Sequence, residues 1–167
     1  MDNNQLTHDQ HINKPVTTEI ILACDHIKAP SNIGAIFRLA DAFQVSEIIF
    51  FGSEIDLTSH RLKKTARNTQ RFIRFRESEN LKNTIQELHD KSYTSIALEI
   101  TSKSIPIQEF DTTIANKLVL IIGHENYGIS DTILEIAHHT LHIPMYGDNS
   151  SMNVAQATAI ALYALRS

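Results

Sequence analysis

The most informative segment of this 167-residue chain is Ile143-Pro144-Met145-Tyr146-Gly147-Asp148-Asn149-Ser150-Ser151-Met152-Asn153-Val154-Ala155. It begins like the end of a buried strand, continues as a polar loop with Gly147, and ends in a helix that starts on small polar residues. A loop of this kind between apolar walls can hold a ligand through its backbone. We therefore expect a binding site near the C-terminus.

Two earlier segments have the same character, namely residues 31–38 (SNIGAIFR) and residues 122–130 (IGHENYGIS). Four of the five glycines of the chain, Gly34, Gly123, Gly128 and Gly147, lie in these three segments, and the fifth is Gly52. Gly52, Gly123 and Gly147 are expected to follow strands. Ligands of open parallel sheets bind at the carboxyl ends of the strands, so the three segments point to one edge of a sheet.

The pattern of apolar residues predicts strands that alternate with helices. The expected strands are Glu19–Cys24, Glu47–Phe51, Arg71–Phe75, Thr94–Glu99, Lys117–Ile122 and Leu141–Ile143. The expected helices are one capped by Ser31 or Asn32, one over Glu77–Lys91, a short one capped by Ser130, and Ser151–Leu165. This order predicts an α/β fold with a mostly parallel sheet and helices on both faces. Residues 1–18 are predicted to be a mobile lead-in to a single domain over residues 19–167.

Composition excludes several classes of protein. Hydrophobic residues make up 42% of the chain and charged residues 20%, which is ordinary for a globular domain. No apolar run approaches the roughly 18 residues that span a bilayer, and the polar N-terminus has no signal core. Cys24 is the single cysteine, so an intrachain disulfide is excluded and a reducing compartment is favoured. We expect a cytoplasmic protein without a membrane partner.

Positive charge is concentrated in residues 60–76. This segment contains seven of the 15 lysines and arginines and none of the 19 acidic residues, although the chain has a net charge of −4. A basic segment on an otherwise acidic chain is typical of a surface that binds and positions the phosphates of a polyanion. The alternative interpretation is a charged surface that contacts only solvent.

Several familiar sites are missing from the sequence. It has neither G-x-G-x-x-G after the first predicted strand nor G-x-x-x-x-G-K-[ST], so a dinucleotide fold or a P-loop is disfavoured. It also lacks the G-x-S-x-G elbow of hydrolases. His138, His139 and His142 have no cysteine or carboxylate at zinc-ligand spacing, and we interpret them as surface histidines rather than a metal site.

Three polar residues are candidates for chemistry. Asn32 and Arg38 are less than two helical turns apart, so both can reach the same end of the sheet, although Asn32 could be a plain cap and Arg38 a surface charge. Arg38 emerges beside apolar neighbours, where a phosphate is its natural partner. Glu125 follows a buried strand, and its carboxylate could hold the loop through backbone N–H groups or face a ligand.

The start of the last predicted helix has two interpretations. Ser151 and Asn153 are good N-cap residues. Together with Ile143, Met145 and Met152 they also make an apolar wall with a few polar contacts, which suits an adenine and a sulfonium.

In combination, the three segments resemble the SpoU/TrmH family of the SPOUT superfamily, the knotted RNA ribose 2′-O-methyltransferases. Its N-x-G-x-x-x-R motif is matched by Asn32, Gly34 and Arg38, and its G-x-E-x-x-G-[LI]-S motif by residues 123–130. Its I-P-M and S-[LM]-N-V elements are matched by residues 143–145 and 151–154. The resemblance covers the chain from about Glu19 onward.

The resemblance implies a deep C-terminal trefoil knot, an exception to the rule that chains do not thread loops. It implies a homodimer that binds S-adenosylmethionine without a metal, with the pockets near the subunit interface. The implied cofactor-binding residues are Leu98, Gly123, Ile143, Ser151, Met152 and Asn153.

The implied catalytic residues are Arg38, Asn32 and Glu125. Arg38 would help to deprotonate the ribose 2′-OH, or would clamp a phosphate and stabilise charge, since a guanidinium is a poor base. Asn32 would orient the ribose or Arg38, and Glu125 would hold a loop. The retention of all three residues argues against a catalytically silent RNA-binding homologue.

RNA capture is expected to rest on the domain itself, because the chain shows no N-terminal RNA-binding domain and no basic C-terminal tail. The expected RNA contacts are Arg61, Lys63, Lys64, Arg67 and Arg71. The predicted function is methylation of tRNA, for example at a D-loop guanosine, with rRNA as the alternative substrate.

Overall fold

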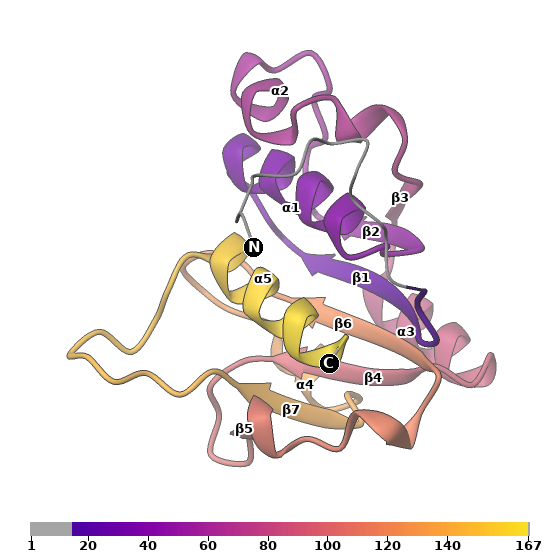
Figure 1. Cartoon of the computed structure of the whole chain (residues 1–167), viewed down its shortest axis with the longest axis vertical. Coiled ribbons are helices and arrows are strands. Elements are labelled where there is room, and N and C mark those ends of the chain that lie inside the picture. Colours follow the sequence, from indigo (N-terminus) through magenta and orange to yellow (C-terminus); the bar gives the residue numbers. More distant parts are fainter. Residues whose placement is uncertain (1–14, 167) are drawn as a thin grey trace, which may run out of the picture.

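The computed structural model describes residues 15–166 and shows a seven-stranded sheet with helices on both faces (Figure 1). The strands are β1 (Glu19–Asp25), β2 (Glu47–Phe51), β3 (Phe75–Ser78), β4 (Thr94–Leu98), β5 (Ile105–Pro106), β6 (Lys117–Ile122) and β7 (His139–His142). Their order in the sheet is β3-β2-β1-β6-β4-β7-β5, and every neighbouring pair is parallel. The predicted α/β fold with a parallel sheet is confirmed.

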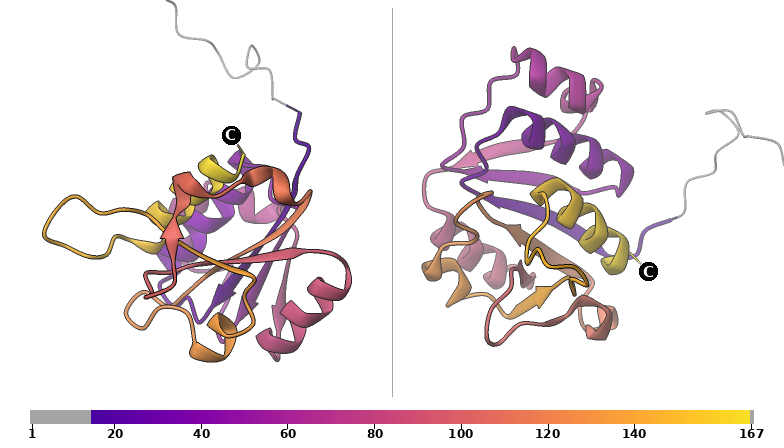
Figure 2. Two further views of the ribbon diagram at one scale, coloured as in Figure 1. Left: turned by 90° about the horizontal axis from the view of Figure 1, so that it is seen from below. Right: turned by 90° about the vertical axis from the view of Figure 1, so that its left-hand side faces the viewer.

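Helices cover both faces of the sheet. The α-helices are α1 (Pro30–Ala42), α2 (His60–Ala66), α3 (Leu81–Asp90), α4 (Asp131–Leu134) and α5 (Val154–Leu165). Short 3-10 turns are η2 (Thr69–Arg71), η3 (Ile107–Glu109) and η4 (Thr112–Ile114). Helices α1 and α5 lie on one face, and α3 and α4 on the other (Figures 1 and 2). Alternate residues of β1 therefore enter two separate cores, Ile20 and Leu22 in one and Ile21 and Ala23 in the other.

Most predicted elements occur where the apolar pattern placed them. The strands at Glu47–Phe51 and Lys117–Ile122 are confirmed to the residue. The strand expected at Arg71–Phe75 is wrong: residues 69–71 form η2, and the edge strand β3 begins at Phe75. Helix α2 was not predicted. The predicted lead-in falls mainly on residues 1–14, which lie outside the described residues.

Helix α1 begins without a side-chain cap, so the predicted capping by Ser31 or Asn32 is wrong. Its N-cap is Ala29, whose carbonyl accepts the amides of Asn32 at 2.9 Å and Ile33 at 3.0 Å, and Pro30 occupies the first helical position. Proline suits that position because its missing N–H would have no partner there. The Asn32 side chain is thereby available for contacts outside the helix.

Gly34 brings α1 and α2 into close contact. A Cβ at Gly34 would overlap Thr65 Oγ1 and the backbone carbonyl of Leu62, closer than any real Cβ contact. Leu62 and Ala66 of α2 are buried in the core that α1 covers. The basic residues of α2 are thus held rigidly against α1 at the β3 edge of the molecule.

Candidate functional site

A cavity of about 630 Å³ lies at the carboxyl ends of β4, β6 and β7. The cavity is lined by residues 98–101 at the end of β4, by residues 122–129 with Asp131 and Leu134 at and after the end of β6, by His142, Ile143 and Met145 at the end of β7, and by residues 150–152 with Val154 and Ala157 at the start of α5. The segment between β7 and α5 projects away from the body of the domain (Figures 1 and 2). The volume of the cavity is in the range of small-molecule binding sites.

Five of the six residues predicted to bind the cofactor line this cavity: Leu98, Gly123, Ile143, Ser151 and Met152. Asn153 is not among the cavity-lining residues of the described chain. It is the N-cap of α5, where its side-chain oxygen accepts the amides of Ala155 at 2.9 Å and Gln156 at 3.3 Å. Ser151 precedes the helix, which starts later than predicted, at Val154.

Backbone forms much of one wall. A Cβ on Gly123 would overlap the backbone of Gly128 and Ile129, so the two ends of this loop pack against each other directly. Gly128 has a φ of +70°, and a Cβ there would meet the carboxylate of Glu99. Both positions require glycine, because a side chain would push the loop open or displace Glu99.

Glu125 holds the start of α1. Its carboxylate accepts hydrogen bonds from the Ala29 amide at 3.0 Å, the Asn32 side-chain amide at 2.9 Å and the Lys28 amide at 3.3 Å. Partial burial alone would raise the pKa of Glu125, but the hydrogen bonds from Ala29, Asn32 and Lys28 lower it overall. These contacts favour the interpretation that Glu125 fixes the loop rather than transferring a proton.

Asn32 joins the three motif segments. Its amide nitrogen donates to Glu125, and its oxygen accepts from the Asn153 side chain at 3.0 Å. Its exposed fraction is 8%. Because both ends of the buried amide are satisfied from different segments, Asn32 sets the positions of the Glu125 loop and of the first turn of α5 relative to α1.

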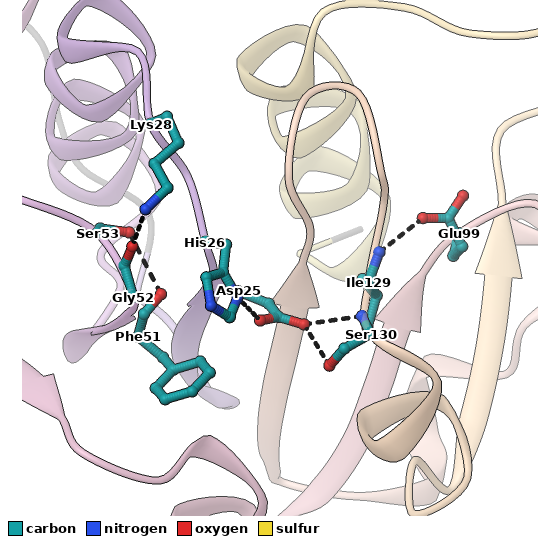
Figure 3. A network of polar contacts seen from close by, with 9 residues as sticks. All are labelled: Asp25, His26, Lys28, Phe51, Gly52, Ser53, Glu99, Ile129 and Ser130. Carbon is teal, nitrogen blue, oxygen red and sulfur yellow. Dashed lines mark hydrogen bonds and ion pairs between the residues drawn. The ribbon is translucent and has the colours of Figure 1, made fainter.

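A second network ties the same loop to β1 (Figure 3). The buried carboxylate of Asp25 accepts the Ser130 amide at 2.8 Å and the Ser130 hydroxyl at 2.7 Å, and its other oxygen contacts His26 Nδ1 at 2.6 Å. Glu99 accepts the Ile129 amide at 3.1 Å (Figure 3). Two carboxylates therefore anchor the end of the loop that forms the cavity wall.

Asp25 and Glu99 were not predicted as site residues. Each is a carboxylate at the carboxyl end of a strand, which is the signal that drew attention to Glu125. Their partners Ser130 and Ile129 lie 105 and 30 positions away in the chain, so the sequence pattern alone does not indicate the contact.

The structure does not bring Arg38 to the cavity of the same chain. Arg38 is exposed on α1, one turn after Gly34, and it is not among the described residues that line the cavity. The predicted RNA contacts Arg61, Lys63, Lys64, Arg67 and Arg71 are all exposed, on α2 and the turn that follows it. Arg74 and Arg76 instead pair with Glu47, at 3.1 Å and 3.3 Å.

The cavity suits a cationic ligand without phosphate. Leu98, Ile143 and Met152 offer an apolar wall, and the carboxylates of Glu99 and Asp131 lie among the lining residues. No lysine or arginine of residues 15–166 lines it. S-adenosylmethionine combines a flat adenine with a sulfonium and an ammonium group, so this set of residues fits it.

No group of three or more histidine, cysteine, aspartate or glutamate side chains among residues 15–166 is arranged to hold a metal ion. Within the same residues, the helices are all too short or too polar to cross a membrane.

The comparison with known proteins identifies relatives over almost the whole domain. The family model described as "SpoU rRNA Methylase family" matches residues 19–163, which confirms the resemblance seen in the motifs. A tRNA (guanosine(18)-2′-O)-methyltransferase from Aquifex aeolicus is 31% identical over 87% of this chain and 67% of its own length. A 23S rRNA (guanosine(2553)-2′-O)-methyltransferase from Bacillus subtilis is 28% identical over 92% of this chain and 60% of its own length.

A solved structure shares the fold. The AdoMet-bound rRNA methyltransferase from Sinorhizobium meliloti superposes with a TM-score of 0.81 and is 27% identical over 89% of this chain and 56% of that chain. The present chain thus spans between about half and two thirds of the length of these relatives. The prediction of S-adenosylmethionine as the cofactor is confirmed for the family.

Proposed function

Because this chain belongs to the SpoU rRNA Methylase family, we propose that it transfers a methyl group from S-adenosylmethionine to a ribose 2′-OH of RNA. The observation that carries the proposal is the cavity lined by the second and third motif segments, to which the buried Asn32 of the first segment is joined by hydrogen bonds with Glu125 and Asn153. An RNA-binding protein without catalysis would not need these contacts around a ligand-sized cavity.

The residues of the chain have separate tasks in the proposed reaction. The cofactor supplies an electrophilic methyl group on a sulfonium. Leu98, Ile143 and Met152 bind its apolar parts, and Glu99 and Glu125 keep the loop after β6 in place. Arg38 binds the phosphate beside the target ribose and stabilises charge as the hydroxyl proton leaves for water, because a guanidinium holds its own proton too tightly to act as a base.

We propose that the active unit is a homodimer. Arg38 lies outside the cavity of its own chain, and α1 presents it to solvent. A second copy with its cavity against this surface would complete the site. We also propose that the C-terminal segment forms the trefoil knot of the family, since β7 is inserted between β4 and β5 before the chain returns to α5 beside α1.

The substrate class proposed first is tRNA. The A. aeolicus relative is named as a tRNA enzyme, and the exposed basic residues of α2 offer phosphate contacts within the domain itself. An rRNA substrate is the second candidate, because the B. subtilis relative is named as a 23S rRNA enzyme.

The test is methyl transfer to defined RNA pools. Wild-type protein and the Arg38→Ala variant are incubated with methyl-labelled S-adenosylmethionine and with unmodified tRNA or rRNA. We expect label in the tRNA pool, at a nucleotide that resists alkaline hydrolysis, and none with Arg38→Ala despite unchanged cofactor binding by calorimetry. Label in rRNA alone would select the second substrate, and no label in either pool would refute the function.

A further inference from the structure

Phe72 is the exposed phenylalanine of this chain. Its exposed fraction is 77%, whereas the other six phenylalanines are buried or packed against the two cores. A phenylalanine ring has no polar group to interact with water, so this exposed ring offers an apolar face to a binding partner.

The backbone holds Phe72 in a defined place. Arg67 and Asn68 have φ values of 48° and 74°, which turn the chain sharply after α2. Thr69 then accepts the amides of Phe72 at 3.0 Å and Ile73 at 3.1 Å, while its hydroxyl donates to the Ala66 carbonyl at 2.6 Å. Thr69 and Gln70 before Phe72 are buried, and the half-buried Ile73 and Phe75 after it pack against the core, so the ring is presented from a well-anchored turn.

The charges around Phe72 indicate what it contacts. Lys64, Arg67 and Arg71 are exposed and form no ion pair with any of residues 15–166. The segment from residue 60 to residue 76 contains no carboxylate. An apolar protein partner would leave these cations without counterions, whereas a nucleic acid offers a phosphate for each cation and a base for the ring.

We propose that Phe72 stacks on an unpaired base of the RNA while Arg67 and Arg71 bind the flanking phosphates. The proposal rests on the proposed function in that the bound polymer is the RNA substrate. It adds that the recognised region is a loop or single strand. A base inside a duplex has both faces covered by its neighbours, so an aromatic ring reaches only a base that is splayed out.

The chain contains no tryptophan, so Phe72→Trp introduces a single fluorescent reporter at this position. The titrants are a single-stranded RNA 12-mer and the same 12-mer annealed to its complement. We expect strong quenching and a blue- or red-shifted emission with the single strand, and little change with the duplex. Unchanged emission at saturating single-stranded RNA would overturn the stacking.

Two further variants separate the contribution of stacking to RNA binding from the contribution of charge. Phe72→Ala is expected to weaken single-strand binding about 5- to 100-fold without changing its dependence on salt. Arg71→Ala is expected to reduce the slope of the logarithm of the binding constant against the logarithm of the salt concentration by about one. The matched control is Ile114→Ala, which removes another exposed apolar side chain, 48% exposed, away from the basic segment, and should leave binding unchanged.

The outcomes distinguish this proposal from its premises. If Phe72→Ala binds single-stranded RNA like wild type while wild type still methylates RNA, the stacking is wrong and the function stands. If no RNA is methylated but the Phe72→Trp emission is quenched by single strands, the function is wrong and the stacking stands. If Phe72→Ala instead turns a sedimenting dimer into a monomer, Phe72 belongs to a subunit interface and the proposal is overturned.

Discussion

The side chain of Asn153 donates a hydrogen bond to the side chain of Asn32, 121 positions earlier in the chain, over 3.0 Å. Asn32 in turn donates to Glu125 at 2.9 Å. The first, second and third motif segments are thus joined by one buried amide. An amide fits here because it donates to a carboxylate at one end and accepts from a second amide at the other, which neither aspartate nor a hydrophobic residue can do.

Variants of Asn32 test the hydrogen bonds that it makes with Glu125 and Asn153. Asn32→Ala removes one hydrogen bond from Glu125 and leaves the side-chain amide nitrogen of Asn153 without its acceptor, and we expect a loss of about 1–3 kcal/mol in the free energy of unfolding. Asn32→Asp should be worse near neutral pH, because two carboxylates would face each other. Their repulsion raises the pKa of the pair in the folded state, so Asn32→Asp should gain stability relative to Asn32→Ala as the pH falls. Urea unfolding of both variants across the acidic range measures this, and parallel curves would contradict it.

Arg38 is the residue that tests the proposed dimer. Arg38→Ala should be inactive, and so should Met152→Arg, which puts a cation into a cavity proposed for a cationic cofactor. If Arg38 serves the cavity of the partner, mixed dimers have one complete site. Randomly mixed subunits should then recover about a quarter of the wild-type activity, because half of the dimers are mixed. Mixtures that stay inactive, although mass spectrometry shows mixed dimers, would place Arg38 in the site of its own chain.

The sequence predicts this fold well where a strand is a continuous run of buried residues. Strands β2 and β6 are short apolar runs buried on both faces, and their ends were predicted to the residue. β3 is an edge strand with exposed Arg76 and Glu77, and the apolar residues before it suggested an earlier strand. Helix α2 buries Leu62 and Ala66 alone, too few residues for a periodic signal.

Five of the six residues predicted to bind the cofactor line the cavity, but the contacts within the site were not predicted. Glu125, Asn32 and Asn153 were recognised by motif, yet the capping of α1 by Asn32 was wrong because Ala29 and Pro30 begin that helix. The actual partners of Asn32 are distant in sequence and meet through the order of the strands. The position of Arg38 outside the cavity likewise depends on how far along α1 it lies.

Gly34 offers a test of the α1–α2 contact in which two effects oppose each other. Alanine favours a helix over glycine by about 1 kcal/mol, so Gly34→Ala would stabilise an exposed helix. Here the new methyl group overlaps the backbone of α2, which cannot move aside, and overpacking typically costs about 1–3 kcal/mol. We expect net destabilisation and weaker RNA binding. Gly147→Ala is the control, because a Cβ there meets nothing within 4 Å; equal unfolding midpoints for the two variants would refute the close contact.

A histidine pair between α3 and β7 predicts a loss of stability in mild acid. The rings of His89 and His138 lie 4.0 Å apart, and both contact the buried Ser95, His89 through Nε2 at 2.8 Å. Burial, and then the proximity of His138, lower the pKa of His89 below 6.5, against a smaller opposing effect of Asp90. Well above pH 6.5 both the folded and the unfolded state hold His89 neutral. Below it the unfolded state takes up the proton first, so stability falls until the folded-state pKa is passed.

His89→Gln tests this pH dependence. Glutamine keeps a group that can hydrogen-bond Ser95 but does not titrate, so the variant should lose less stability than wild type between about pH 7 and pH 5. Urea midpoints at several pH values measure the difference. His60→Gln, at the exposed start of α2, is the matched control and should follow wild type. If His89→Gln also followed wild type, the acid sensitivity would belong to another group, of which His139, whose pKa is lowered by burial and by His138, is the next to replace.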